Sequence, residues 1–286
     1  MMPSRARSIA LWAITLVFGA FNVVTSVFPD LVPAGPVGII NTILLVAFAL
    51  VHGTAIYGAK GIAIFAIVCL VVGNIFENLS ITTGFPFGHY HYTGVLGPKL
   101  FLVPVTIGGA YFGAGYLSWT LALMLLGRAA RPFDAYARWA VPVAASVLMA
   151  SWDFVLDPIA STINRYWIWE NGGGFFGVPF TNYLGWLLTV FLFFAAFGGY
   201  VAMRRSGDAA RTPSASFWAS AVVTYALLGV RYVLTYFVPS ANTQFADAAG
   251  HTWMRHDIYE TAALAAVFTM LAFSTLAALR LADRSR

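Results

Sequence analysis

Charge is scarce in this sequence, and that scarcity argues against a water-soluble protein. Charged residues make up 9% of the 286 residues, whereas hydrophobic residues make up 60%. Soluble domains carry roughly 25% charged residues, so this chain has too few to cover a surface that faces water. Several apolar runs also exceed the roughly 18 residues that indicate a membrane span. The composition predicts a multi-pass protein of the plasma membrane, and its net charge of +5 indicates topology rather than nucleic-acid binding.

Cysteine is almost absent, and cofactor motifs are missing. The single cysteine, Cys69, lies in an apolar run, which excludes an intrachain disulfide and a cysteine-based metal site and favours a packed thiol. The sequence contains no P-loop, no GxSxG motif and no pair of Asp-rich motifs that would bind a magnesium diphosphate. Its two lysines, Lys60 and Lys99, lie at span ends, which disfavours a retinal Schiff base. We therefore expect no cofactor and no metal.

Eight apolar runs predict an all-α bundle of about eight transmembrane helices in a single domain over residues 1–286. Arg5 and Arg7 precede the first run, which we interpret as a retained span rather than a cleaved signal peptide. The runs cover approximately residues 8–28, 36–57, 61–83, 100–127, 138–160, 180–203, 214–238 and 255–280.

The basic residues support this count. With eight spans, twelve of the sixteen Lys and Arg residues fall on one side of the membrane. The positive-inside rule predicts that this side is cytoplasmic and that it contains both termini. The twelve are Arg5, Arg7, Lys60, Arg128, Arg131, Arg138, Arg204, Arg205, Arg211, Arg280, Arg284 and Arg286.

A group of polar residues lies near the opposite, non-cytoplasmic ends of the spans. They come from different spans but are all within about two helical turns of that side. Polar groups kept inside a membrane are costly and are usually functional. Their common depth predicts one cavity that opens toward the outer leaflet. The residues are Glu77, Asp153, Asp157, Asn182, Arg231, Asp257 and Glu260.

The region of residues 70–190 contains a weak internal repeat. An acid precedes the sequence GFPFG at residues 84–88 and the pair Val103-Pro104; another acid precedes GFFG at residues 174–177 and the pair Val178-Pro179. Both units would cross the membrane in the same direction, so the repeat would be parallel, with its shared site between the halves. An accidental similarity of two loops rich in Gly and Pro is the alternative.

Asp153 and Asp157 are four residues apart and therefore share one helical face, with Trp152 beside them. Two carboxylates close together in an apolar site cannot both ionise cheaply, so one of them stays a neutral acid. A neutral acid in a dry pocket is the group that protonation of an unactivated alkene requires. The alternative is that either Asp forms a structural ion pair with Arg231 or Arg165.

Two other helix ends carry polar groups with both a functional and a structural interpretation. Glu77 and Asn78 follow Asn74 by three and four residues, so each shares a helical face with it, either as part of a site or as a solvated helix end. Asp257 and Glu260 open the last span, where acids also stabilise a helix N-terminus. We expect Arg231, within the seventh span, to pair with a carboxylate.

Aromatic residues crowd the two outer loops that follow the acids. His89, Tyr90, His91 and Tyr92 lie in one loop, and Trp167 and Trp169 lie in the other. They fit an aromatic belt at the membrane interface, or a wall that stabilises a carbocation through its π faces. His89 and His91 alone do not complete a metal site.

Two blocks of residues resemble a known family. The first comprises FEN at residues 76–78, TGFPFGHYHYT at residues 83–93 and Val103-Pro104; the second comprises DFVLDP at residues 153–158, WIW at residues 167–169 and GVPFTNYLGW at residues 177–186. Together they resemble the integral-membrane carotenoid hydratases, which include the bisanhydrobacterioruberin and γ-carotene hydratases. The match covers roughly residues 70–190, and the remaining spans match only in hydrophobicity.

The resemblance implies cofactor-independent addition of water to the terminal isopropylidene double bond of an acyclic carotenoid. Glu77, Asp153 and Asp157 would supply the proton donor and the base, and Asn78 or Asn182 would position the water. The aromatic residues of the outer loops would shelter the cation, and the partners would be the bilayer, a lipophilic isoprenoid and other enzymes of the pathway. Two alternatives stay open: a membrane terpene cyclase that acts on a shorter isoprenoid, and a proton-coupled carrier.

Overall fold

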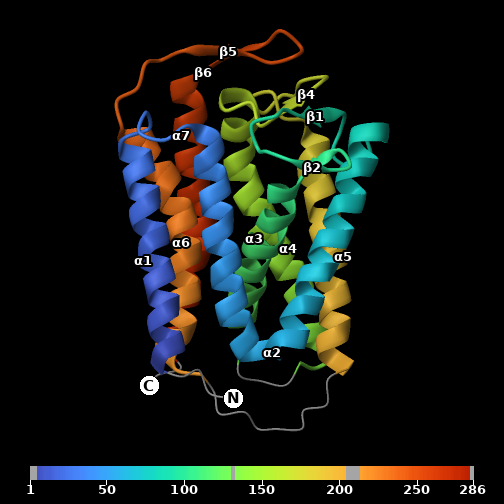
Figure 1. The fold of residues 1–286 in the computed structure, drawn as a ribbon, viewed down its shortest axis with the longest axis vertical. Coiled ribbons are helices and arrows are strands. Elements are labelled where there is room, and N and C mark those ends of the chain that lie inside the picture. The colour runs from blue at the N-terminus through green and yellow to red at the C-terminus, as the bar shows by residue number, and fades with distance from the viewer. Residues whose placement is uncertain (1–4, 130–132, 204–212, 284–286) are drawn as a thin grey trace.

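The computed structural model describes residues 5–129, 133–203 and 213–283, which form a helical bundle capped at one end by short strands (Figure 1). Its helices are α1 (Arg5–Val27), α2 (Ala34–Thr83), α3 (Val105–Leu125), α4 (Ala135–Asp157), α5 (Phe180–Met203), α6 (Ala215–Phe237), α7 (Arg255–Ala266) and α8 (Ala272–Asp283). A π-helical segment, η1 (Pro158–Ile163), extends α4, and another, η2 (Val267–Leu271), joins α7 to α8. In the described chain, six helical segments are long and apolar enough to cross a membrane. The predicted all-α membrane protein is confirmed.

Helix α2 folds back on itself at Gly58. This residue has φ 71° and ψ 172°, a backbone conformation that glycine adopts without steric cost. Figure 1 shows that the two arms of α2 run in opposite directions from this turn. Near the turn the arms are so close that a β-carbon built on Gly53 would lie 2.4 Å from the side chain of Ile62. The arms correspond to the predicted spans at residues 36–57 and 61–83.

Helix α3 lies at the centre of the bundle and is not among the six apolar segments. Every residue from Tyr111 to Met124 is buried, and α3 packs against α2, α4, α6 and α8. Small residues permit this close packing: a β-carbon built on Gly113 would lie 2.7 Å from that of Leu45 in α2. Because α3 is surrounded by protein, it needs fewer large apolar residues than a helix that faces lipid.

Three short antiparallel strand pairs cap one end of the bundle (Figure 1). Strand β1 (Tyr90–Tyr92) pairs with β4 (Trp167–Trp169), and β2 (Lys99–Leu100) pairs with β3 (Val103–Pro104). Strands β5 (Gln244–Ala246) and β6 (Thr252–Met254) form a hairpin. The start of α1 and the turn of α2 lie at the opposite end of the bundle (Figure 1).

The predictions of eight spans and of cytoplasmic termini stay predictions. The single domain over residues 1–286 and the weak parallel repeat also stay predictions. Six of the basic residues on which the orientation depends lie outside the described residues: Arg131, Arg204, Arg205, Arg211, Arg284 and Arg286.

The loop that leads into α5 depends on a glycine without room for a side chain. A β-carbon built on Gly173 would lie 2.2 Å from the backbone carbonyl carbon of Val178, whereas one built on Gly174 would meet nothing within 4 Å. We expect Gly173→Ala to destabilise the protein by about 3 kcal/mol, because backbone atoms would have to move, and Gly174→Ala to have little effect. Thermal unfolding in detergent measures both; equal stability of the two variants would show that this loop can adjust.

Candidate active site

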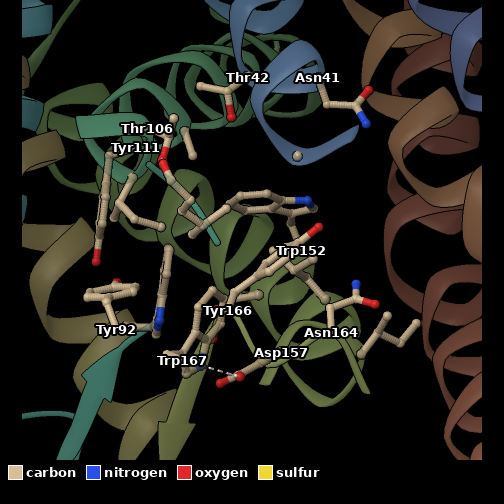
Figure 2. Close-up of a pocket in the computed structure, with 18 of the residues that line it drawn as sticks. Asn41, Thr42, Tyr92, Thr106, Tyr111, Trp152, Asp157, Asn164, Tyr166 and Trp167 are labelled. Atoms are coloured by element: carbon tan, nitrogen blue, oxygen red, sulfur yellow. Dashed lines mark hydrogen bonds between the residues drawn. The ribbon is translucent and has the colours of Figure 1, made fainter. Parts of the chain in front are cut away.

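A cavity of about 110 Å³ lies among the helices near the strand-capped end of the bundle. Both arms of α2, helices α3 to α6 and strands β1 and β4 contribute to its wall. Figure 2 shows that aromatic side chains, including Trp152, Tyr92 and Trp167, surround its interior. Three acids also line it: Glu77, Asp153 and Asp157. All three are buried.

Glu77 accepts hydrogen bonds from three tyrosine hydroxyl groups. Tyr92 donates to Oε2 at 2.8 Å, Tyr111 donates to Oε1 at 2.7 Å, and Tyr90 also donates to Oε2. Burial, followed by the charge of Glu77, raises the pKa of Tyr90 and of Tyr92 well above the usual value. Both phenols therefore keep their protons and act as donors. An ionised carboxylate is the form of Glu77 that can accept from all three.

Asp153 and Asp157 share the side-chain amide of Asn182. Asn182 Nδ2 donates to Asp157 Oδ2 at 2.8 Å and to Asp153 Oδ2 at 3.0 Å. Asp157 accepts two further hydrogen bonds at Oδ1, from the indole N–H groups of Trp167 at 2.9 Å and Trp169 at 3.3 Å. No hydrogen bond from the described residues reaches Asp153 Oδ1. The two aspartates are therefore neighbours with unequal stabilisation of their negative charge.

The pairing of β1 with β4 explains how the two loops that contain these strands place hydrogen-bond donors beside the acids. Tyr90 lies opposite Trp169 and Tyr92 lies opposite Trp167. Successive side chains of a strand point to opposite faces, so these four rings share the buried face. Each strand donates to an acid of the helix that precedes it: β1 to Glu77 of α2, and β4 to Asp157 of α4.

The loop at residues 84–88 is fastened to α2 and α5. Ser80 Oγ accepts a hydrogen bond from the backbone N–H of Phe87 at 3.0 Å and donates to the carbonyl of Gly88 at 2.9 Å. Thr181 Oγ1 donates to the carbonyl of Phe87 at 2.9 Å. Gly185 permits this contact, because a β-carbon there would lie 2.6 Å from the Phe87 ring. These contacts fix the start of β1 and thus the tyrosines that bond to Glu77.

Stacked aromatic rings form the apolar part of the wall. The rings of Tyr111 and Trp186 are parallel, with centroids 4.9 Å apart, and Trp152 meets Trp186 edge to face at 6.2 Å. All three residues line the cavity. Because the face of an aromatic ring carries partial negative charge, such a wall can stabilise a cation formed beside it.

The sequence matches the family model described as "Carotenoid biosynthesis protein" over residues 35–247, about three-quarters of the chain. The chain belongs to this carotenoid biosynthesis family. A bisanhydrobacterioruberin hydratase from Haloarcula japonica is 33% identical over 186 residues, which are 63% of this chain and 58% of that relative's length. No solved structure matches the chain.

In this carotenoid biosynthesis protein, most of the predicted site residues line one cavity. The predicted proton-transfer residues, the bridging amide and most of the aromatic residues are among them. They are Glu77, Asp153, Asp157, Asn182, Arg231, Tyr90, Tyr92, Trp152, Trp167 and Trp169.

Three residues predicted from the same segments lie outside the cavity wall. His89 and His91 are exposed, because they alternate along the chain with the buried Tyr90 and Tyr92. His91 instead pairs with exposed Glu170 at 3.2 Å. Asn78 donates to the carbonyl of Asn74 at 2.8 Å and accepts from the backbone N–H of Leu102 at 3.1 Å. It therefore holds the turn between β2 and β3 against α2.

Asp257 and Glu260 also lie outside the cavity wall. Both are exposed in α7, where Ile258 is the buried neighbour, and Glu260 lies 3.8 Å from His256. Asp257 lies in the first turn of α7, so its interpretation as an acid that stabilises a helix N-terminus suits it better. The expected ion pair of Arg231 is absent among the described residues: its guanidinium packs over the ring of Tyr232 at 5.3 Å, and its Nε has no partner there.

The structure adds residues that sequence reasoning missed. Tyr111 is the third donor to Glu77, and Asn41 lines the cavity from the first arm of α2. Trp186 lies one helical turn after Asn182, and this spacing was the signal that could have located it. Nothing in the sequence around Tyr111 or Asn41 marks either. Within the described residues, no three His, Cys, Asp or Glu side chains are grouped to hold a metal ion.

Proposed function

We propose that this membrane enzyme of carotenoid biosynthesis adds water to the terminal isopropylidene double bond of an acyclic carotenoid end. The observation that carries the proposal is the placement of three buried acids with unequal hydrogen bonding in one aromatic cavity. The family supports a carotenoid substrate, and the relative named as a hydratase supports addition of water. The reaction would use the acids of the chain and no cofactor.

Asp153 is the proposed proton donor. Hydrogen bonds that a carboxylate accepts favour its ionised form. Glu77 accepts three such bonds and Asp157 accepts three, whereas Asp153 accepts one, from Asn182. A further negative charge beside two ionised acids is unfavourable in a site with little water. Asp153 is therefore the acid best suited to hold a proton.

The proposed reaction proceeds in two steps and is redox-neutral. Asp153 transfers its proton to the CH carbon of the terminal double bond, which leaves a tertiary cation and an Asp153 carboxylate. A water molecule then forms a C–O bond to the tertiary carbon, and Asp157 accepts the proton that this water loses. Return of one proton from Asp157 to Asp153 restores the site. The product is a tertiary alcohol.

The cavity has the size and the wall that this reaction requires. Its volume of about 110 Å³ is smaller than the roughly 150 Å³ of an apolar cavity that holds benzene. It would therefore enclose the end of an isoprenoid, and the polyene would extend outside it. The faces of Trp152, Trp186 and Tyr111 would stabilise the cation, and ionised Glu77 would add a favourable charge.

The two alternatives have less support. A cyclase would form the same cation but close a ring, and neither comparison favours that outcome. A proton-coupled carrier would need polar groups along a path through the membrane, whereas these acids converge on one cavity near the strand-capped end. We also propose that the enzyme resides in the plasma membrane near other enzymes of its pathway.

Expression in a lycopene-producing bacterium tests the proposed function. Mass spectrometry of the extracted pigments should show a product heavier by one water for each modified end. A matched strain that carries Asp153→Asn provides the control, because the variant keeps the shape of the side chain. A product isomeric with the substrate would indicate cyclisation, and unchanged pigments beside abundant membrane-inserted enzyme would contradict hydration.

A further inference from the structure

The cavity has a second polar region, which the acids do not use. Figure 2 shows Asn41 and Asn164 on one side of Trp152, and Tyr92 and Tyr111 on the other. Arg231 also lines the cavity and comes from α6. Asn41 and Arg231 are linked through α1: Asn22 Nδ2 donates to Asn41 Oδ1 at 2.8 Å, and Ser26 Oγ, one helical turn later, donates to the carbonyl of Arg231 at 3.4 Å.

Two N–H donors in this region lack protein partners among the described residues. Asn41 is 6% exposed, and its Nδ2 is buried without a hydrogen-bond acceptor, as is Nε of Arg231. An arginine keeps its proton in a protein, so its N–H groups always require acceptors. A buried donor without an acceptor costs free energy comparable to a lost hydrogen bond. Both donors therefore favour a ligand that supplies oxygen lone pairs. Asn22 Oδ1, on the amide that bonds to Asn41, is a buried acceptor without a donor in the part of the chain that the structure describes, and it favours a ligand that also donates.

The nearby acids do not supply those lone pairs. Glu77 bonds to three tyrosines, Asp157 to two tryptophans and Asn182, and Asp153 to Asn182. An anionic ligand fits poorly, because this cavity combines one arginine with three acids in a mostly aromatic wall. Water fits, since a buried water typically makes about three hydrogen bonds and occupies about 30 Å³ of liquid volume.

We propose that Asn41 and Arg231 form a water-holding subsite that supplies the nucleophile of the hydration. This inference rests on the proposed function and assigns positioning roles to two residues that the proton-transfer steps do not use. The donors hold the water through the lone pairs of its oxygen and leave its O–H bonds free to point toward a base; one of the two hydrogen bonds is released as its lone pair forms the C–O bond. In Figure 2, Asn41 lies on the far side of Trp152 from Tyr92 and Tyr111, which donate to Glu77.

Incubation of the membrane-embedded enzyme with an acyclic carotenoid in D₂O tests this subsite. Protonation followed by loss of a proton leaves deuterium in the recovered alkene, whereas capture by water gives the alcohol; mass spectrometry measures both. In Asn41→Leu and in Arg231→Met, the bound water loses one hydrogen bond. The ratio of deuterated alkene to alcohol should therefore rise by about two- to tenfold, which corresponds to the net contribution of one hydrogen bond. The matched control is Thr25→Val, because the Thr25 hydroxyl donates to carbonyl groups of its own helix and does not line the cavity; this variant should keep the wild-type ratio.

These measurements test the hydration and the water-holding subsite separately. A wild-type enzyme that forms no alcohol contradicts the proposed hydration, and the water-holding role with it. Alcohol formation by the wild type, with an unchanged ratio in both variants, overturns the subsite alone. A purely structural role of either residue would lower protonation and capture together, so it would also leave the ratio unchanged.

Discussion

Asp153→Asn is expected to lower the rate of hydration by about 10²- to 10⁴-fold, the contribution typical of a general acid. The substitution keeps the size of the side chain but removes the proton that the alkene would receive. Because Asp153 accepts one hydrogen bond from the described residues, at 3.0 Å from Asn182, the bundle should remain folded. The measurement is alcohol formation per mole of membrane-inserted enzyme, with thermal unfolding as the test of integrity.

Asp157→Asn is the matched control for that prediction. It should also impair hydration, but at the second step, because protonation by Asp153 would continue. In D₂O, this variant should still place deuterium in the recovered alkene, whereas Asp153→Asn should not. If Asp157→Asn stops the exchange and Asp153→Asn does not, the assignment of donor and base is reversed.

Glu77→Gln is expected to lower both stability and activity. Three tyrosine hydroxyls donate to the two oxygens of Glu77, whereas a glutamine offers one acceptor oxygen. Hydrogen bonds to a charged group contribute roughly 1.5–3 kcal/mol each, so the loss of about two should cost about 3–6 kcal/mol. The negative charge beside the cation is lost as well. Thermal unfolding and alcohol formation measure the two effects.

Tyr111→Phe separates the two effects of Glu77. It removes one of the three donors and leaves the carboxylate with Tyr90 and Tyr92. We expect a loss of about 1.5–3 kcal/mol of stability, the value of one hydrogen bond to a charged group, and retention of more activity than in Glu77→Gln. Equal stability of the two variants would show that the Glu77 charge does not organise this cluster.

The depth of the site could be predicted from the sequence, because a helix rises by a fixed distance per residue. Glu77, Asp153, Asp157 and Asn182 do line one cavity, as their similar depth near the same ends of the predicted spans indicated. It was harder to predict which side of each helix is buried. Asp257 has a similar predicted depth but is exposed, since the buried face of α7 is that of Ile258.

The loop that contains β1 has a sequence pattern that also predicts which of its side chains are buried. The alternation of His and Tyr at residues 89–92 is the pattern of a strand, in which successive side chains face opposite sides. It separates the exposed His89 and His91 from the buried Tyr90 and Tyr92. By contrast, the bond from Tyr111 to Glu77 joins residues 34 positions apart, and only the packing of α3 against α2 brings them together.

Infrared spectroscopy of the membrane-embedded enzyme at neutral pH tests most directly whether a buried carboxylic acid holds the proton. We expect a carbonyl band of a protonated carboxyl group that shifts in D₂O, disappears in Asp153→Asn and persists in Asp157→Asn. The absence of any such band from the wild-type enzyme, or its persistence in Asp153→Asn, would contradict the assignment of Asp153 as the donor.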